Sequence, residues 1–108
     1  LKKNITGYSF NDNETLNCIK NIHKKNNYIL DPHGAIGYLG LKQYLKTNTN
    51  QIGVFLETAH PSKFSEVVEK VINKKVDVPK KLSQTLNRQK KSIQILNYNH
   101  FKEFLLEN

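Results

Sequence analysis

Two short stretches of the sequence place polar, proton-handling side chains directly after an apolar run. In LDPHGAIGY these side chains are Asp31 and His33, and in LETAHPSKF they are Thr58 and His60. A carboxylate accepts hydrogen bonds, a hydroxyl donates and accepts them, and an imidazole changes its charge near neutral pH. The two stretches therefore hold the candidate ligand-binding residues of this chain.

The hydrophobic periodicity places each stretch between a predicted strand and a predicted helix. Asn11 and Glu14 have the spacing of a capping box, which predicts where the first helix starts. Pro61 suits the first position of a later helix. The predicted elements are a helix at 11–27, a strand at 28–32, a helix at 34–47, a strand at 52–57, a helix at 61–72, a short helix within 80–89 and a final helix at 97–108.

This order predicts the α/β class, with a partial parallel sheet and flanking helices. A strand, a crossover helix and a second strand form a right-handed unit in which the two strands run parallel. Ligands bind beyond the carboxyl ends of such strands, where helix N-termini also point. If both strands belong to one sheet, the four candidate side chains gather at the same edge of that sheet.

Each candidate also has a purely structural interpretation. Asp31 and His33 can cap the helix that starts at Gly34. Thr58 can satisfy backbone groups at the end of a strand, and His60 can cap the helix that follows it. The residue types alone leave both interpretations open.

Three glycines stand at intervals of three residues in the second predicted helix. Gly34, Gly37 and Gly40 would share one face of that helix. Because glycine costs about 1 kcal/mol relative to alanine inside a helix, their repetition indicates that a backbone or a ligand approaches this face closely.

Composition excludes several other classes of protein. The chain has 108 residues, enough for one domain with a modest core, and no apolar run long enough to span a membrane. Its net charge is +8, but only Arg88 among 17 basic residues is arginine and no aromatic residues interleave with the lysines, so nucleic acid is not an expected partner. The lone Cys18 is expected to be a small buried apolar residue. These features indicate a cytoplasmic protein.

The four histidines do not form a recognisable metal site. They have no local ligand-pair spacing and no cysteine partner nearby, so no metal is expected. No serine stands in the context of a nucleophile elbow, so no catalytic triad is expected either. The histidines concerned are His23, His33, His60 and His100.

Two sequence blocks resemble the C-terminal part of the threonine synthase family. That family carries a D-P-H-x-A-x-G block followed, after the next strand, by a T-A-H-P-x-K-F block. Residues 31–37 and 58–64 match these blocks in the same order, and the resemblance covers roughly residues 7–95. Gly34 departs from the family, because many members carry a hydroxyl residue at that position.

The resemblance implies a pyridoxal-phosphate enzyme of the tryptophan-synthase-β fold type, a lyase that converts O-phospho-L-homoserine and water to L-threonine and phosphate. Thr58 would then lie against the pyridine nitrogen of the cofactor, since a neutral hydroxyl can hydrogen-bond that nitrogen without forcing its protonation. Asp31, His33 and His60 would line the cofactor or substrate site, with no assigned roles. The Schiff-base lysine and the loop that binds the cofactor phosphate would come from the rest of the same enzyme chain, so no catalytic residue is assigned here.

The family members are several times longer than this chain. Residues 1–108 are therefore interpreted as a single C-terminal α/β fragment, inactive alone, in which residues 76–108 form a tail that ends in a helix. The alternative is a small stand-alone α/β binding or interaction module, which would be expected to begin with methionine, and the chain contains no methionine. Cutting a sheet exposes edges and apolar faces, so self-association of the fragment is a further expectation.

Overall fold

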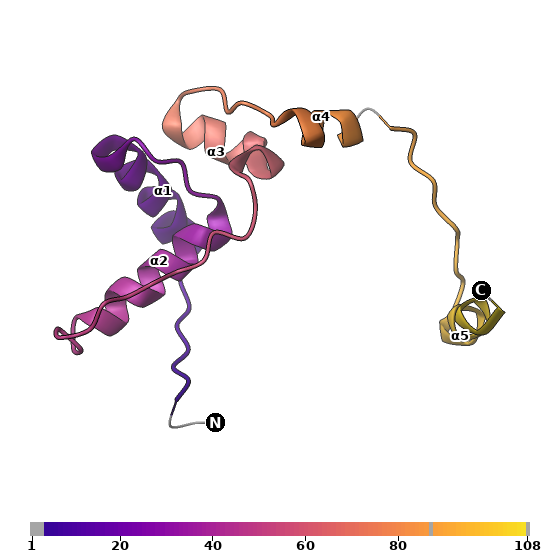
Figure 1. Cartoon of the computed structure of the whole chain (residues 1–108), viewed down its shortest axis with the longest axis horizontal. Helices are drawn as coiled ribbons and strands as arrows, with labels where there is room; N and C mark the ends of the chain where they lie inside the picture. Colours follow the sequence, from indigo (N-terminus) through magenta and orange to yellow (C-terminus); the bar gives the residue numbers. More distant parts are fainter. Residues whose placement is uncertain (1–3, 87, 108) are drawn as a thin grey trace. The chain divides into compact units, whose positions relative to one another are not determined.

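Helices and extended segments make up the part of the chain that the structure, a computed structural model, describes, residues 4–86 and 88–107 (Figure 1). The helices are α1 (Asp12–Asn26), α2 (Pro32–Leu45), the short 3-10 helix η1 (Pro61–Phe64), α3 (Ser65–Ile72), α4 (Lys80–Leu86) and α5 (Tyr98–Glu107). The chain divides into two units, Leu1–Val78 and Pro79–Asn108. Within the described residues, no helix is long and apolar enough to cross a membrane.

Local signals in the sequence fix both ends of α1. The side chain of Asn11 accepts a hydrogen bond from the Glu14 N–H at 3.0 Å, and Glu14 Oε2 accepts one from the Asn11 N–H at 2.9 Å. At the other end, Asn27 adopts a left-handed conformation with φ 51° and donates its N–H to the His23 carbonyl. The predicted capping box is confirmed.

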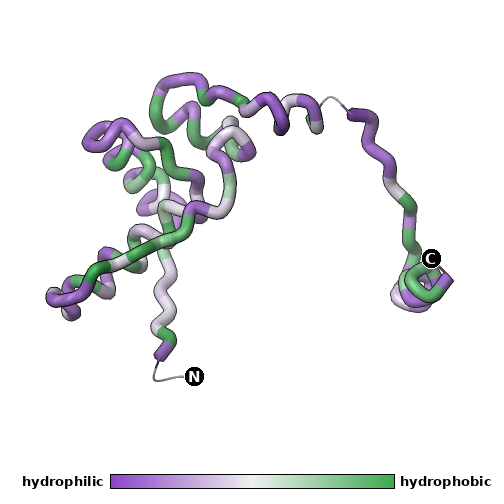
Figure 2. Tube along the Cα trace, in the orientation of Figure 1, coloured by the Kyte–Doolittle hydropathy of each residue, from purple (hydrophilic) through white to green (hydrophobic). Residues whose placement is uncertain are grey.

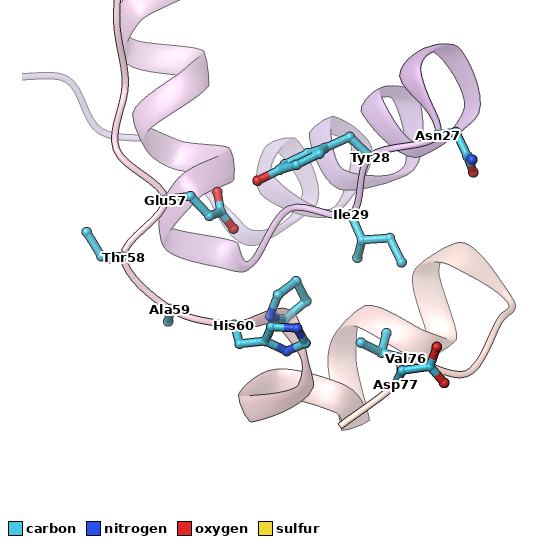
Figure 3. A pocket seen from close by; sticks show the side chains of 10 residues that line it. Asn27, Tyr28, Ile29, Glu57, Thr58, Ala59, His60, Val76 and Asp77 are labelled. Atoms are coloured by element: carbon cyan, nitrogen blue, oxygen red, sulfur yellow. The ribbon is translucent and has the colours of Figure 1, made fainter. Parts of the chain in front are cut away.

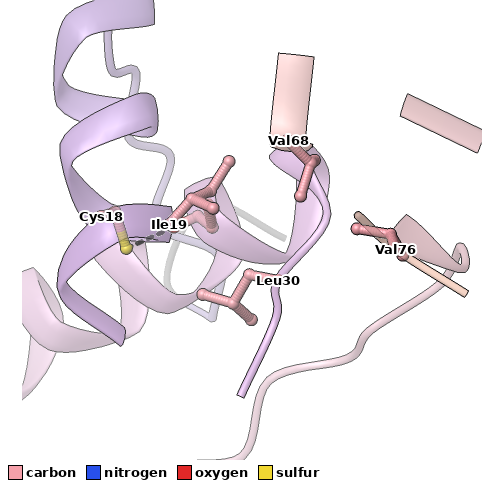
Figure 4. Packing of buried hydrophobic residues seen from close by; sticks show 6 residues of the cluster. Cys18, Ile19, Leu30, Val68 and Val76 are labelled. Atoms are coloured by element: carbon pink, nitrogen blue, oxygen red, sulfur yellow. Dashed lines mark hydrogen bonds between the residues drawn. The ribbon is translucent and has the colours of Figure 1, made fainter. Parts of the chain in front are cut away.

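A small apolar core forms where α1 packs against α2 and α3. Six buried residues make up this core, and all lie in the first unit. Ile19, Leu30 and Val68 are completely buried, and Cys18 donates a long hydrogen bond from Sγ to the Ala35 carbonyl at 3.7 Å (Figure 4). Burial raises the pKa of the Cys18 thiol, so the predicted role of this cysteine as a small buried core residue is confirmed. The six are Cys18, Ile19, Leu30, Ala35, Val68 and Val76.

The segment after α2 runs back along this helix in an extended conformation (Figure 1). Every second residue of the segment faces α2. A Cβ built on Gly34 would collide with the Glu57 carboxylate, one on Gly37 would lie 4.0 Å from Phe55, and one on Gly53 would lie 2.5 Å from Leu41. Phe55 also contacts Tyr38 of α2 edge-on, with ring centroids 5.7 Å apart.

The alternate residues of the same segment face outwards. Ile52, Val54 and Leu56 are 98%, 81% and 77% exposed, and Figure 2 shows the segment as predominantly apolar. A close approach to the glycine face of α2 is found at Gly34, where the neighbour is the Glu57 side chain and not a backbone or a ligand. A Cβ on Gly37 or Gly40 would make only ordinary contacts, with Phe55 at 4.0 Å and with Tyr8 at 3.5 Å.

The predicted parallel sheet is not confirmed within the described residues. The segments predicted as strands, 28–32 and 52–57, contain no strand, and α2 already begins at Pro32. Leu30 and Phe55, one from each segment, line a shared cavity of about 330 Å³ with Tyr28 and Tyr38. The α/β prediction therefore recovers the helices and the extended segments but not a sheet.

The second unit contains α4 and α5. Neither helix has a buried residue within its described part. Asn97 caps α5, because its side-chain oxygen accepts a hydrogen bond from the His100 N–H at 3.0 Å. The two helices predicted in this part of the sequence are confirmed for the described residues, while positions 87 and 108 of these predictions lie outside the described residues.

Candidate active-site junctions

Asp31 starts α2 and is completely buried. Its backbone is extended, with φ −77° and ψ 164°, and Oδ1 accepts a hydrogen bond from the His33 N–H at 2.8 Å. Pro32 occupies the first helical position, where its missing N–H costs nothing. The capping interpretation of Asp31 is confirmed, and it starts the helix two residues before the predicted Gly34.

His33 connects the first junction to the second. Its Nδ1 lies 2.9 Å from Asp31 Oδ1, and its ring packs against that of Phe64 with centroids 5.1 Å apart. Phe64 is the last residue of the second sequence block, so this contact brings the two blocks together. The side chain of His33 is 64% exposed, although its Nδ1 is engaged with Asp31.

Glu57 makes the most direct link between the two junctions. Its Oε1 accepts a hydrogen bond from the Asp31 N–H at 2.7 Å, and its carboxyl group lies over Gly34. This residue was not among the sequence candidates, although it stands beside Thr58. Two features of the sequence could have identified Glu57. It is an acidic residue at the end of an extended segment, and the helix that it faces has a glycine, Gly34, in its first turn.

The carboxyl groups of Asp31 and Glu57 shift each other's pKa in opposite directions. Burial favours a raised pKa for Asp31, but hydrogen bonds from His33, and one with Glu57, outweigh it and lower this pKa. Burial is also the main cause at Glu57, where it raises the pKa. The hydrogen bond from the Asp31 N–H opposes this rise, while the neighbouring Asp31 carboxylate adds to it.

His60 caps the short helix η1. Its backbone is extended, with φ −75° and ψ 136°, and Nδ1 accepts a hydrogen bond from the Ser62 N–H at 3.2 Å. The same nitrogen lies 2.8 Å from Ser62 Oγ. The capping interpretation of His60 is therefore confirmed as well.

Thr58 is exposed and forms no hydrogen bond with any other described residue through its hydroxyl group. In Figure 3 its side chain points away from those of Glu57 and Tyr28. This direction follows from the extended backbone, because successive side chains point to opposite sides. Glu57 is thus directed to α2, and the hydroxyl of Thr58 is directed outwards.

A cavity of about 600 Å³ lies beside this junction (Figure 3). Thr58 and His60 line it, whereas Asp31 and His33 do not. The structure therefore divides the four predicted residues into two adjacent pairs, which Glu57 connects. The lining residues are Asn27, Tyr28, Ile29, Glu57, Thr58, Ala59, His60, Pro61, Val76 and Asp77.

The four histidines occupy different places in the structure. His23 is on α1, His33 is in the first turn of α2, His60 precedes η1 and His100 is on α5. Within residues 4–86 and 88–107, no group of three or more histidine, cysteine, aspartate or glutamate side chains is arranged to hold a metal ion.

Comparison with known proteins identifies relatives of the chain. Residues 34–104 match the family model described as "Threonine synthase, C-terminal". Threonine synthase of Buchnera aphidicola subsp. Schizaphis graminum is 40% identical over 100 residues, which are 92% of this chain and 23% of that protein. Threonine synthase of Escherichia coli K12 is 38% identical over 78 residues, which are 72% of this chain and 18% of that protein.

A solved structure agrees with these matches. The crystal structure of threonine synthase from Escherichia coli superposes with a TM-score of 0.66 and 35% identity over 75% of this chain and 18% of that one. The chain spans less than a quarter of the length of these curated relatives. The matched residues 34–104 contain the whole second sequence block and the last four residues of the first.

Proposed function

The chain belongs to the threonine synthase family, and from this membership we propose that it forms one wall of the active site of a pyridoxal-phosphate enzyme. The proposed reaction is the conversion of O-phospho-L-homoserine and water to L-threonine and phosphate. The observation that carries the proposal is the meeting of the two family blocks through the His33–Phe64 ring contact. The 2.7 Å hydrogen bond from the Asp31 N–H to Glu57, the residue before the second block, supports it. Both contacts bring residues far apart in the sequence to the junction that carries Thr58.

The residues present at this junction are compatible with the proposed cofactor. A pyridine nitrogen needs one hydrogen-bond partner, and Thr58 presents an exposed hydroxyl that no other described residue uses. When bound, pyridoxal phosphate supplies an electron sink that stabilises carbanions. Thr58 would hold the ring nitrogen and orient the ring, without supplying a charge that fixes the nitrogen as protonated.

The other candidate residues have structural roles that can support a site. Asp31 caps the N-terminus of α2 and His60 caps that of η1, and both helix ends adjoin the junction. The side chain of His33 is mostly exposed, and His60 lines the cavity. We propose that these three residues line the cofactor or substrate site, and that the Schiff-base lysine and the loop for the cofactor phosphate come from the rest of the enzyme chain.

Further parts of the proposal concern the whole enzyme. The 108-residue chain alone is expected to be inactive, because the proposed lysine and phosphate loop lie outside it. The rest of the same enzyme is its proposed partner, and it would cover the exposed apolar side of the extended segment. A cytoplasmic location is proposed, as for a biosynthetic enzyme of amino-acid metabolism.

The direct experiment supplies O-phospho-L-homoserine to the full-length protein that carries this chain and measures both products. Equal amounts of phosphate and threonine are expected. Release of phosphate without threonine would contradict the synthase assignment and indicate a phosphatase or an elimination reaction. The isolated 108-residue chain, tested in parallel, is expected to release neither product.

A further inference from the structure

Two buried carboxyl oxygens at the α2 N-terminus lack a hydrogen-bond donor within the described part of the chain. Asp31 Oδ2 and Glu57 Oε2 have no hydrogen-bond donor among the described residues. The second oxygen of each group is engaged, because Asp31 Oδ1 accepts from His33 and Glu57 Oε1 accepts from the Asp31 N–H. Leaving two buried, ionised oxygens without donors would be costly.

A single proton would satisfy both of these oxygens. The Asp31 N–H donates a hydrogen bond of 2.7 Å to Glu57 Oε1, which holds the two carboxyl groups next to each other, and each group shifts the pKa of the other. Two ionised carboxylates at this distance repel, whereas a protonated carboxyl group donates a short, charge-assisted hydrogen bond to an ionised neighbour. Gly34 permits this arrangement, because it has no side chain in the space that the Glu57 carboxyl group occupies.

The surroundings decide which of the two groups is ionised. Asp31 lies at the N-terminus of α2, where the helix dipole favours negative charge, and its Oδ1 accepts the His33 N–H. Glu57 has one backbone donor and lies against the negative charge of Asp31. The proton is therefore more stable on Glu57 than on Asp31.

We propose that Asp31 and Glu57 form a carboxyl pair in which Glu57 Oε2 donates a shared proton to Asp31 Oδ2, and that this pair fixes the junction carrying Thr58 to the N-terminus of α2. Glu57 is then a positioning residue, since it acts on the site through its neighbour in the chain. The role in orienting Thr58 depends on the proposed function, whereas the proton-sharing pair itself does not.

The other ionisable groups near the pair come from several elements. His33 is beside Asp31, and Cys18 of α1 contacts the α2 backbone at Ala35. The cavity beside Glu57 adds three more groups. These are Tyr28, His60 and Asp77.

The decisive experiment compares the full-length protein with its Glu57→Gln and Glu57→Ala variants by thermal unfolding from pH 4 to pH 8. Glutamine has the shape of a protonated glutamate and can donate the same hydrogen bond, but it does not titrate. Groups that titrate equally in both proteins cancel in the difference between their Tm values. The comparison therefore isolates the proton of Glu57.

The expected sign follows from the raised pKa of Glu57. Its contribution to stability is complete below the ordinary value of 4.5 and is lost as the pH rises through the pKa of the folded protein. The Tm of the wild type is thus expected to equal that of Glu57→Gln at the acidic end. As the pH rises, the Tm of the wild type should fall increasingly below that of Glu57→Gln. Glu57→Ala is expected to melt below Glu57→Gln at every pH, because it leaves the Asp31 N–H and Oδ2 unpaired.

Two results would overturn the pair. One is a Tm difference between wild type and Glu57→Gln that stays constant with pH. The other is a wild type that gains stability relative to Glu57→Gln as the pH rises, or on addition of Mg²⁺ or Ca²⁺, which would indicate that an ionised Glu57 binds a cation. Should Glu57→Ala fail to fold, the comparison of wild type with Glu57→Gln still decides.

Assays on the same proteins separate this inference from the proposed function. The expected pH dependence without any threonine formation would leave the carboxyl pair standing and contradict the enzyme assignment. Threonine formation together with a Tm difference that stays constant with pH would support the enzyme assignment and contradict the carboxyl pair. If both hold, the pH profile of kcat/KM should differ between wild type and Glu57→Gln over the range in which their Tm values separate.

Discussion

The carboxyl group of Glu57 occupies the space that a side chain at Gly34 would need. Glu57 also accepts the Asp31 N–H at 2.7 Å, so a side chain at Gly34 would push on a carboxyl group that this hydrogen bond holds in place. The two residues are 23 positions apart in the sequence (57 − 34). Their contact joins the residue that directly precedes the second family block to the helix that the first block begins.

Replacement of Gly34 by alanine is expected to lower the free energy of unfolding by about 1–2 kcal/mol, the cost of displacing a buried hydrogen-bonded carboxyl group. Gly37→Ala is the matched control in the same helix, because its Cβ would meet Phe55 only at 4.0 Å. That control should gain up to about 1 kcal/mol from helix propensity. Urea unfolding of the chain followed by circular dichroism measures both changes.

A double-mutant cycle tests whether Glu57 causes the cost at position 34. In a Glu57→Ala background the space over Gly34 is free, so Gly34→Ala should cost less than it does in the wild type. Equal costs in both backgrounds would show that the helix itself, and not Glu57, disfavours a side chain there.

Asn11→Ala should remove the cap of α1 and lower the free energy of unfolding by about 1 kcal/mol. The reason is the loss of the hydrogen bond that the Glu14 N–H donates to the Asn11 side chain at 3.0 Å. Asn13→Ala changes the same residue type two positions later, on the exposed side of α1. This control is expected to change stability by less than about 0.5 kcal/mol in the same urea titration.

Asp31→Asn tests the pH dependence of the α2 cap. Because the pKa of Asp31 is lowered from its ordinary 3.8, the ionised group stabilises the folded chain above that value and loses this contribution as the pH falls through the folded pKa. Asparagine also caps helices but carries no charge. The variant should be less stable than wild type at pH 6, and the gap should close in thermal unfolding between pH 4 and pH 2.

If the stability difference between wild type and Asp31→Asn did not narrow in acid, the lowered pKa of Asp31 would be contradicted. Asp12→Asn is a suitable control, because Asp12 is an exposed aspartate in the first turn of α1 and forms no side-chain hydrogen bond or ion pair with another described residue. Its stability difference from wild type should be small at both ends of the pH range.

Self-association of the isolated chain is expected to depend on the outward face of the extended segment. Ile52, Val54 and Leu56 are among its most exposed apolar side chains, and an unpaired extended backbone with such a face is prone to pair with another copy. Val54→Lys should shift sedimentation-velocity profiles towards monomer. Asn50→Lys adds the same charge in the preceding turn and should leave the association unchanged.

A single monomeric species of the wild-type chain at high concentration would contradict this prediction. In the full-length protein the same face is proposed to be covered, so Val54→Lys should there lower Tm instead of changing the oligomeric state.

Thr58→Ala in the full-length enzyme should lower the rate of threonine formation by about 3- to 10-fold, which corresponds to one neutral hydrogen bond. Thr58→Ser keeps the hydroxyl group and should retain most of the rate. The measurement is threonine release from O-phospho-L-homoserine at saturating cofactor. A rate for Thr58→Ala equal to that of wild type would contradict the proposed contact with the ring nitrogen.

Local chemistry made several features predictable. The capping box of Asn11 and Glu14, and the proline that begins η1, act within one helical turn, so their effect is visible in the sequence. Asp31 and His60 were correctly given a capping alternative for the same reason. The family blocks were recognisable because they are contiguous stretches.

The sequence pattern predicts the start of α2 at Gly34, two residues after the observed start at Pro32. The prediction assigned Pro32 to the preceding strand because proline favours an extended residue before it. Asp31 is indeed extended, but as the cap of a helix whose first residue is Pro32. A residue at the end of a strand and a helix cap both have an extended backbone, so the local sequence pattern could not distinguish these two roles of Asp31.

The sequence by itself determined where the helices lie, which residues start them, and to which family the chain belongs, because helix hydrogen bonds and caps join residues three or four positions apart. Only the tertiary structure decided that residues 52–57 pack along α2 without forming a strand, since a strand needs a distant backbone partner that alternation does not specify. It also decided that Glu57 meets Asp31 and Gly34. That contact depends on the packing of two segments, and no spacing within either one contains it.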